Sequence, residues 1–214
     1  MKKTKKILCL ILSLALLFSL SACGGSDDVA KAEHGDKDYL GTYTENTYRN
    51  ERFGVLFTAP GTEFQFAMLD DIVKANDMKE ADFSNSRVPE ILADGKEYMV
   101  MYGGDNSTAN STAVVLSKVE EGTDQEKFVE EALEKTKASL ALDSNVEVLA
   151  CELKTGSPVG YDKYIVYTIK ANDQTFYAEQ FFCFTDINMA SISISATSQG
   201  MITLMHTAWK RISN

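Results

Sequence analysis

The fold is decided by residues 146–197, which read VEVLACELKTGSPVGYDKYIVYTIKANDQTFYAEQFFCFTDINMASISISAT. Four runs rich in apolar, β-branched and aromatic residues predict strands at 146–154, 159–170, 175–185 and 189–197. Gly156-Ser157-Pro158 and Asn172-Asp173 are turn sequences, and the second pair tolerates the positive φ of a tight hairpin. The stretch therefore predicts an antiparallel meander. In its last strand, SISISA at 191–196 predicts one buried apolar face and one small polar face.

The residues before and after this meander predict further strands and three helices. Strands are expected at 53–59, 64–68, 97–102 and 113–119, a short helix at 69–76 and a long polar loop at 103–111. Thr123 and Glu126 have the spacing of a capping box before apolar residues at helical spacing. Ile202, Met205 and Trp209 continue that spacing and predict a helix over 200–213. The order of elements predicts an α+β fold with helices against a mainly antiparallel sheet.

Composition limits the class of protein. The chain has 214 residues, 44 % of them apolar, and a formal net charge of −10. This apolar content excludes a disordered chain, and the surplus of acidic residues excludes a nucleic-acid-binding protein. Residues 1–22 contain four Lys and no acidic residue, so 17 basic and 31 acidic residues remain after them, a net charge of −14. We expect such an acidic domain to stay off anionic lipid headgroups.

The N-terminus has the features of a secretory leader. Basic residues at 2–6 precede an apolar run at 7–20 that is shorter than a membrane span. Leu20-Ser21-Ala22-Cys23 then resembles the bacterial lipobox, which implies cleavage before Cys23 and lipidation of its thiol. We therefore expect a signal peptide at 1–22, a lipidated Cys23 with a flexible tether at 23–45, and one domain at 46–214. The alternatives are a secreted protein cleaved after Ala22 and an uncleaved anchor helix.

A second resemblance concerns the start of the domain. Residues 48–60, YRNERFGVLFTAP, resemble the opening "Tyr-x-Asn-x-x-Phe-Gly-Val-x-Phe-x-x-Pro" of the PsbP-like superfamily. The later helices and strands follow the same order, so the resemblance covers about residues 46–214. It implies an α/β/α sandwich around an antiparallel sheet. The superfamily consists mostly of interaction modules, so no catalytic residue is carried over. An aromatic residue expected after Pro60-Gly61 is missing, and Phe64 stands in its place.

A search for catalytic and cofactor-binding motifs finds none. The chain contains no phosphate loop, dinucleotide fingerprint or CxxC pair, so we expect no cofactor. His34 lies in the tether, and His206 is expected to be structural or exposed. Ser157 stands second rather than third in its Gly-rich pentapeptide, which indicates a turn rather than a nucleophile elbow. Cys151 and Cys183 fall on strands that a third strand separates, so we expect them to remain free thiols.

Two larger groups of residues have structural interpretations as well. The acidic residues 70, 71, 77, 80 and 82 lack the spacing of a calcium loop and are expected to form a solvated surface. The aromatic residues of 176–184 are expected to pack in the core rather than stack on a ligand, and Trp209 is expected to anchor it.

Two functions of different classes follow from these observations. The first is a non-enzymatic, membrane-anchored lipoprotein on the extracytoplasmic face, which binds an envelope protein or a small ligand through loops such as 84–96 and 103–112. The second is a cell-envelope hydrolase with a carboxylate pair or a Ser site. A deep cleft with two facing acids, or a Ser beside His206, would favour the enzyme. A filled sheet interior would favour the binding module.

Overall fold

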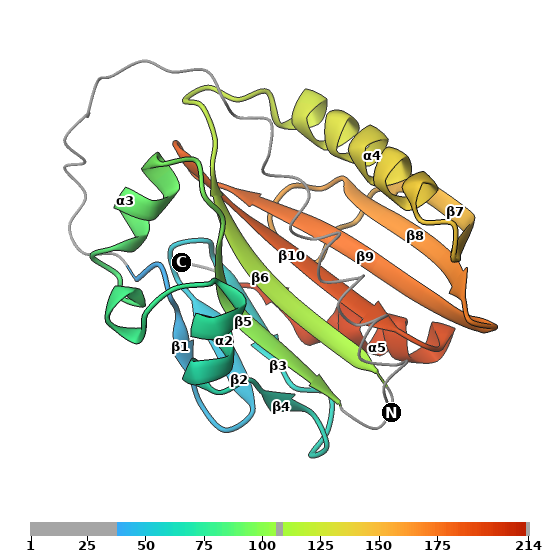
Figure 1. The fold of residues 1–214 in the computed structure, drawn as a ribbon, viewed down its shortest axis with the longest axis horizontal. Helices are drawn as coiled ribbons and strands as arrows, with labels where there is room; N and C mark the ends of the chain where they lie inside the picture. The colour runs from blue at the N-terminus through green and yellow to red at the C-terminus, as the bar shows by residue number, and fades with distance from the viewer. Residues whose placement is uncertain (1–37, 106–108, 213–214) are drawn as a thin grey trace.

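The computed structural model describes residues 38–105 and 109–212, so the leader and Cys23 lie outside the described residues. Its main element is a sheet of seven strands in which every neighbouring pair is antiparallel (Figure 1). In spatial order the strands are β4 (Gln65–Phe66), β5 (Tyr98–Asp105), β6 (Asn110–Lys118), β10 (Asn188–Ala196), β9 (Gln174–Phe184), β8 (Tyr164–Ala171) and β7 (Val146–Lys154). The predicted meander forms one half of this sheet, from β7 to β10.

A second, smaller sheet has four antiparallel strands. In order they are β1 (Thr42–Tyr43), β2 (Thr47–Asn50), β3 (Val55–Thr58) and β11 (Trp209–Arg211). The two ends of the domain therefore meet in one sheet, because β11 comes from its last residues and pairs with β3.

The helices and the small sheet cover the two faces of the seven-stranded sheet. Helix α4 (Gln125–Leu142) lies along β7 and β8 on one face, while α5 (Gln199–Ala208) and the small sheet pack on the other (Figure 1). Three shorter elements, α2 (Leu69–Ala75), the 3₁₀ turn η1 (Glu80–Asp82) and α3 (Val88–Ala93), connect β4 to β5. The predicted α+β class, an α/β/α sandwich around an antiparallel sheet, is confirmed, with the small sheet as part of one outer layer.

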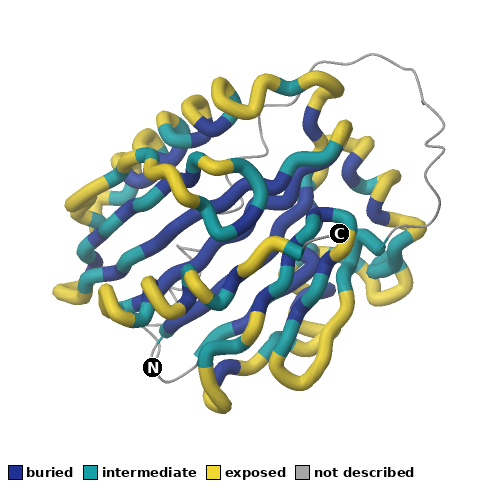
Figure 2. The backbone as a smooth tube through the Cα atoms, turned by 180° about the vertical axis from the view of Figure 1, so that it is seen from behind, coloured by how far each residue is buried: buried dark blue, intermediate teal, exposed yellow. Residues whose placement is uncertain are grey.

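Two apolar cores fill the spaces between these layers. One lies under α4 and contains Val129, Leu140 and Phe182. The other lies under α5, α3 and the small sheet and contains Tyr48, Phe57 and Phe181 among others. Figure 2 shows that the buried residues follow the central strands, while exposed residues are found mainly on the helices and loops around them. In the described part of the chain, no helix is long and apolar enough to span a membrane.

The alternation of β10 is confirmed. Ile192 and Ile194 enter the core beneath the small sheet. Ser191, Ser193 and Ser195 alternate with them and lie on the opposite face, which is buried as well. There Gln180 Nε2 donates to Ser191 Oγ at 2.7 Å, and the hydroxyls of Ser195 and Ser111 lie 2.9 Å apart. Small polar residues on this face therefore hydrogen-bond across neighbouring strands.

The predicted boundary between tether and domain at residues 45 and 46 is wrong. Leu40 N donates to Asn85 Oδ1 at 2.9 Å, and Tyr43 Oη donates to the Val100 carbonyl at 2.5 Å. Residues 42 and 43 also form β1. The ordered domain thus includes Asp38 and the residues that follow it, which were assigned to the tether.

Three other local predictions need correction. The polar loop 103–111 is largely strand, because β5 continues to Asp105 and β6 begins at Asn110. The N-cap of α4 is Asp124, whose carboxylate accepts from the amides of residues 126 and 127, while Thr123 Oγ1 donates to the Glu120 carbonyl. The C-terminal helix stops at Ala208, because Trp209 pairs with Phe57 as the first residue of β11.

Candidate functional site

The residue pair best suited to acid–base chemistry joins α5 to β9. His206 Nδ1 lies 2.6 Å from Glu179 Oε2, and the two side chains are 23 % and 12 % exposed. Glu179 lies on β9 opposite Ile194, so its side chain is on the face of the sheet that α5 covers. A carboxylate at Nδ1 favours the tautomer with a proton on that nitrogen, which leaves Nε2 as the acceptor.

Two aromatic rings hold the imidazole in place. The rings of Tyr164 and Phe181 each lie 5.5 Å from the His206 ring, centroid to centroid. Burial, and then the negative charge of Glu179, raise the pKa of the Tyr164 phenol. This arrangement can orient a proton on the imidazole. The hydrogen-bond partner that the structure gives to the imidazole is a carboxylate, not the Ser of a nucleophilic pair.

Sequence reasoning placed His206 on the last helix but missed Glu179 as its partner. The two residues are 27 positions apart, so no local spacing connects them. The available signal was Glu179 itself, because a carboxylate inside an aromatic strand needs a hydrogen-bond partner when it is buried.

The two described cysteines remain separate, as expected. Cys151 lies on β7 under α4, and Cys183 lies on β9 in the opposite core, with β8 between the two strands. Burial raises the pKa of the Cys151 thiol to about 11 against the opposing effect of Lys137, and raises that of Cys183 to about 12. Both thiols are therefore protonated at neutral pH and are poor nucleophiles.

The loop that carries Ser157 is a tight turn, as expected. Ser157 Oγ donates to the Val159 carbonyl at 2.5 Å, and Ser157 N donates to the Asp162 carbonyl at 3.0 Å. The next residues fold over Cys183, where Tyr161 N donates to the Phe182 carbonyl at 2.7 Å. The hydroxyl thus holds the turn together and is not directed at a base.

The aromatic residues of β9 and Trp209 pack in the core, and the acidic residues 70–82 lie apart from any site in the described part of the chain. Phe176, Phe181 and Phe182 are fully buried, as is Trp209, whose Nε1 donates to Thr112 Oγ1 at 3.2 Å. The acidic residues 70–82 are spread over α2, its C-terminal turn and η1. Among the described residues, no group of three or more His, Cys, Asp or Glu side chains could hold a metal ion.

The two loops proposed for partner binding are more structured than expected. Residues 84–96 contain α3, whose Val88 and Leu92 are buried in the core. Residues 103–105 and 110–112 belong to β5 and β6, while residues 106–108 lie outside the described ones. The described residues of both segments are therefore partly held in a helix or in strands.

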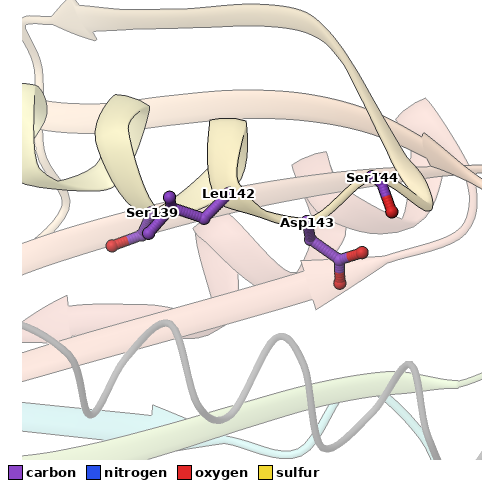
Figure 3. A pocket seen from close by; sticks show the side chains of 4 residues that line it. All are labelled: Ser139, Leu142, Asp143 and Ser144. Atoms are coloured by element: carbon purple, nitrogen blue, oxygen red, sulfur yellow. The ribbon is translucent and has the colours of Figure 1, made fainter.

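Two shallow depressions lie on the surface of the described part of the chain. One of about 420 Å³ is lined by Leu153, Lys154, Thr155 and Lys163, and both lysines already form ion pairs with glutamates. The other, of about 370 Å³, is lined by Ser139 and Leu142 at the end of α4 and by Asp143 and Ser144 in the following turn (Figure 3). Neither depression contains the Glu179 and His206 pair.

No family model matches the chain, and no curated protein matches it. Among solved structures, the chain is similar to cyanobacterial PsbP from Synechocystis sp. PCC 6803, with 9 % identity, a TM-score of 0.42, and coverage of 88 % of this chain and 98 % of that one. It is also similar to LpqN of Mycobacterium tuberculosis, described as involved in cell envelope biogenesis, with 13 % identity, a TM-score of 0.33, and coverage of 51 % and 67 %. Both likenesses are distant in sequence and in structure.

Proposed function

We propose that this chain is a lipoprotein of the cell membrane, anchored through Cys23 on the extracytoplasmic side, whose domain is a non-enzymatic binding or protein-interaction module. The observation that carries the location is Leu20-Ser21-Ala22-Cys23 directly after a basic and apolar leader. Two or more acyl chains hold a protein on a bilayer, because each buried CH₂ contributes about 0.8 kcal/mol.

The packing of the domain supports a binding role. Large side chains such as Phe181, Phe182 and Trp209 fill both faces of the seven-stranded sheet. A filled interior leaves the outer surface as the region that meets a partner. The partner is expected to be an envelope protein or a small ligand.

Metabolic labelling with a fatty acid tests the anchor. Wild-type chain and Cys151→Ala are expected to incorporate the label and to sediment with membranes, whereas Cys23→Ala is expected to do neither. Cys151→Ala is the matched control because it removes a cysteine outside the lipobox. Label on Cys23→Ala would contradict the proposed anchor.

A second experiment separates the binding module from the hydrolase. Cross-linking in intact cells, followed by purification of the lipidated chain, should recover one envelope partner in near-stoichiometric amount. The alternative of a hydrolase is favoured by the Glu179 and His206 pair alone. Turnover of an ester, peptide or glycoside substrate that is lost in both Glu179→Gln and His206→Gln would establish the enzyme instead.

A further inference from the structure

The small sheet has an outer face that is not covered by any described element. Across the strands, Thr42 lies opposite Arg49, Arg49 opposite Leu56, and Leu56 opposite Lys210. These residues alternate with Tyr48, Phe57 and Trp209, which are buried beneath the sheet. We call the row Thr42, Arg49, Leu56 and Lys210, with Thr47 and Thr58 beside it, the outer face.

The charge of this sheet differs from that of the domain. Of the chain's 21 basic and 31 acidic residues, six and four precede residue 38, which leaves 15 and 27 in the rest. The four strands of the small sheet contain Arg49, Lys210 and Arg211 and no Asp or Glu. Glu51, in the turn after β2, lies 3.1 Å from Arg49 Nε and is the nearest opposing charge. Arg211 lies opposite the buried Val55 and so belongs to the other side of the sheet. The outward strand positions thus carry two cations, Arg49 and Lys210, and no acidic residue.

The described chain begins beside this sheet. Asn50 Nδ2 on β2 donates to the Tyr39 carbonyl at 2.9 Å, and the Arg52 guanidinium stacks 4.0 Å above the Tyr39 ring. Fourteen residues, 24–37, separate this point from Cys23, so the two lie at most about 50 Å apart. A chain anchored at Cys23 therefore leads into the domain at the small sheet and not at the far edge at β7.

We propose that the outer face of the small sheet rests on anionic phospholipid headgroups, with Arg49 and Lys210 as the contacts. This inference rests on the proposed lipid anchor at Cys23. A basic residue near an anionic surface increases occupancy about fivefold. The expectation that the acidic domain stays off such headgroups then applies to its other faces, which carry the excess of Asp and Glu.

The test uses the lipidated chain purified from membranes and reconstituted into phosphatidylcholine vesicles with or without phosphatidylglycerol. Acetylation of Lys210 by an amine-reactive reagent is measured by mass spectrometry, with Lys170 on β8 as the internal control. Lys210 is expected to react more slowly on the anionic vesicles at low salt, by up to about fivefold, and to recover at high salt. Lys170 is expected to react equally on both.

A charge reversal at the exposed Arg49 gives the decisive variant. Arg49→Glu should remove the protection of Lys210, whereas Lys170→Glu should leave it intact. Equal reaction of Lys210 on the two vesicle types, or equal protection of Lys170, would overturn the inference. Flotation of the same samples separates this failure from failure of the anchor, because the acyl chains hold the protein on both vesicle types whatever the charge of the small sheet.

Discussion

Gly160 is the position where a single methyl group should damage the domain most. Its φ is +59°, a left-handed conformation that costs a residue with a Cβ about 1–2 kcal/mol. A Cβ at this position would overlap the Phe182 carbonyl oxygen and would lie 2.6 Å from Cys183 Sγ. The first contact is with backbone in the middle of a sheet, so it is not relieved by a side-chain rotation.

The two costs add to a large loss. Overpacking a filled core costs about 1–3 kcal/mol, so Gly160→Ala should lower the free energy of unfolding by about 2–5 kcal/mol. The matched control is Gly122→Ala, because Gly122 has a φ of +76° but a methyl group there would have no atom within 4 Å. It should lose about 1–2 kcal/mol from backbone strain alone.

Urea unfolding of the two variants and wild type, followed by circular dichroism, measures both losses. The melting temperature should fall by roughly 2–4 °C for each kcal/mol in a domain of this size. Cys183→Ala in the Gly160→Ala background should recover only part of the loss, because the clash with the Phe182 carbonyl remains. Equal stability of Gly160→Ala and Gly122→Ala would refute the packing of this loop over β9.

Three further predictions concern other buried groups. Burial raises the pKa of the Cys183 thiol from about 9 to about 12, so as the pH rises the unfolded chain loses the thiol proton before the folded one does. The free energy of unfolding should therefore fall above pH 9. Urea unfolding at several pH values should show this decrease reduced by about 1.4 kcal/mol per pH unit in Cys183→Ala. Trp209→Ala should cost about 3–5 kcal/mol by urea unfolding, and Trp209→Phe should retain most of the packing with Phe57. Nitrogen NMR should show the Nδ1-protonated tautomer of His206 in wild type, with that preference lost in Glu179→Ala.

The meander at 146–197 could be predicted because its signals are local. Runs of apolar residues, short turns and the alternation at Ser191 to Ala196 all lie within a few residues of one another, and β7 spans the predicted residues 146–154. The strands β1 and β2 escaped prediction because Tyr is their only large apolar residue, so they lack the apolar alternation that marks 53–59. Their pairing with distant parts of the chain, rather than their own periodicity, makes them strands.

The pair formed by His206 and Glu179 could not be predicted either, because it also depends on contacts between distant parts of the chain. Both residues could be located in the sequence, one on the last helix and one on an aromatic-rich strand. The way α5 packs on β9 brings the imidazole to the carboxylate, and the sequence does not show this packing. Helical spacing correctly placed Ile202 and Met205 on the buried side of α5. It gave no information about which residue of the sheet lies under the next turn.

The outer face of the small sheet was hidden by one wrong prediction. Trp209 continues the helical spacing of Ile202 and Met205, yet it pairs with Phe57 and its ring packs 5.0 Å from the Phe57 ring. This pairing turns Lys210 outward, opposite Leu56 and in line with Arg49. Had the helix continued, Lys210 would lie on α5 and Arg49 would have no basic neighbour across the sheet. The net charge of the chain gives only the balance of its charges. The pairing of β11 with β3 decides that Lys210 and Arg49 lie on the same face.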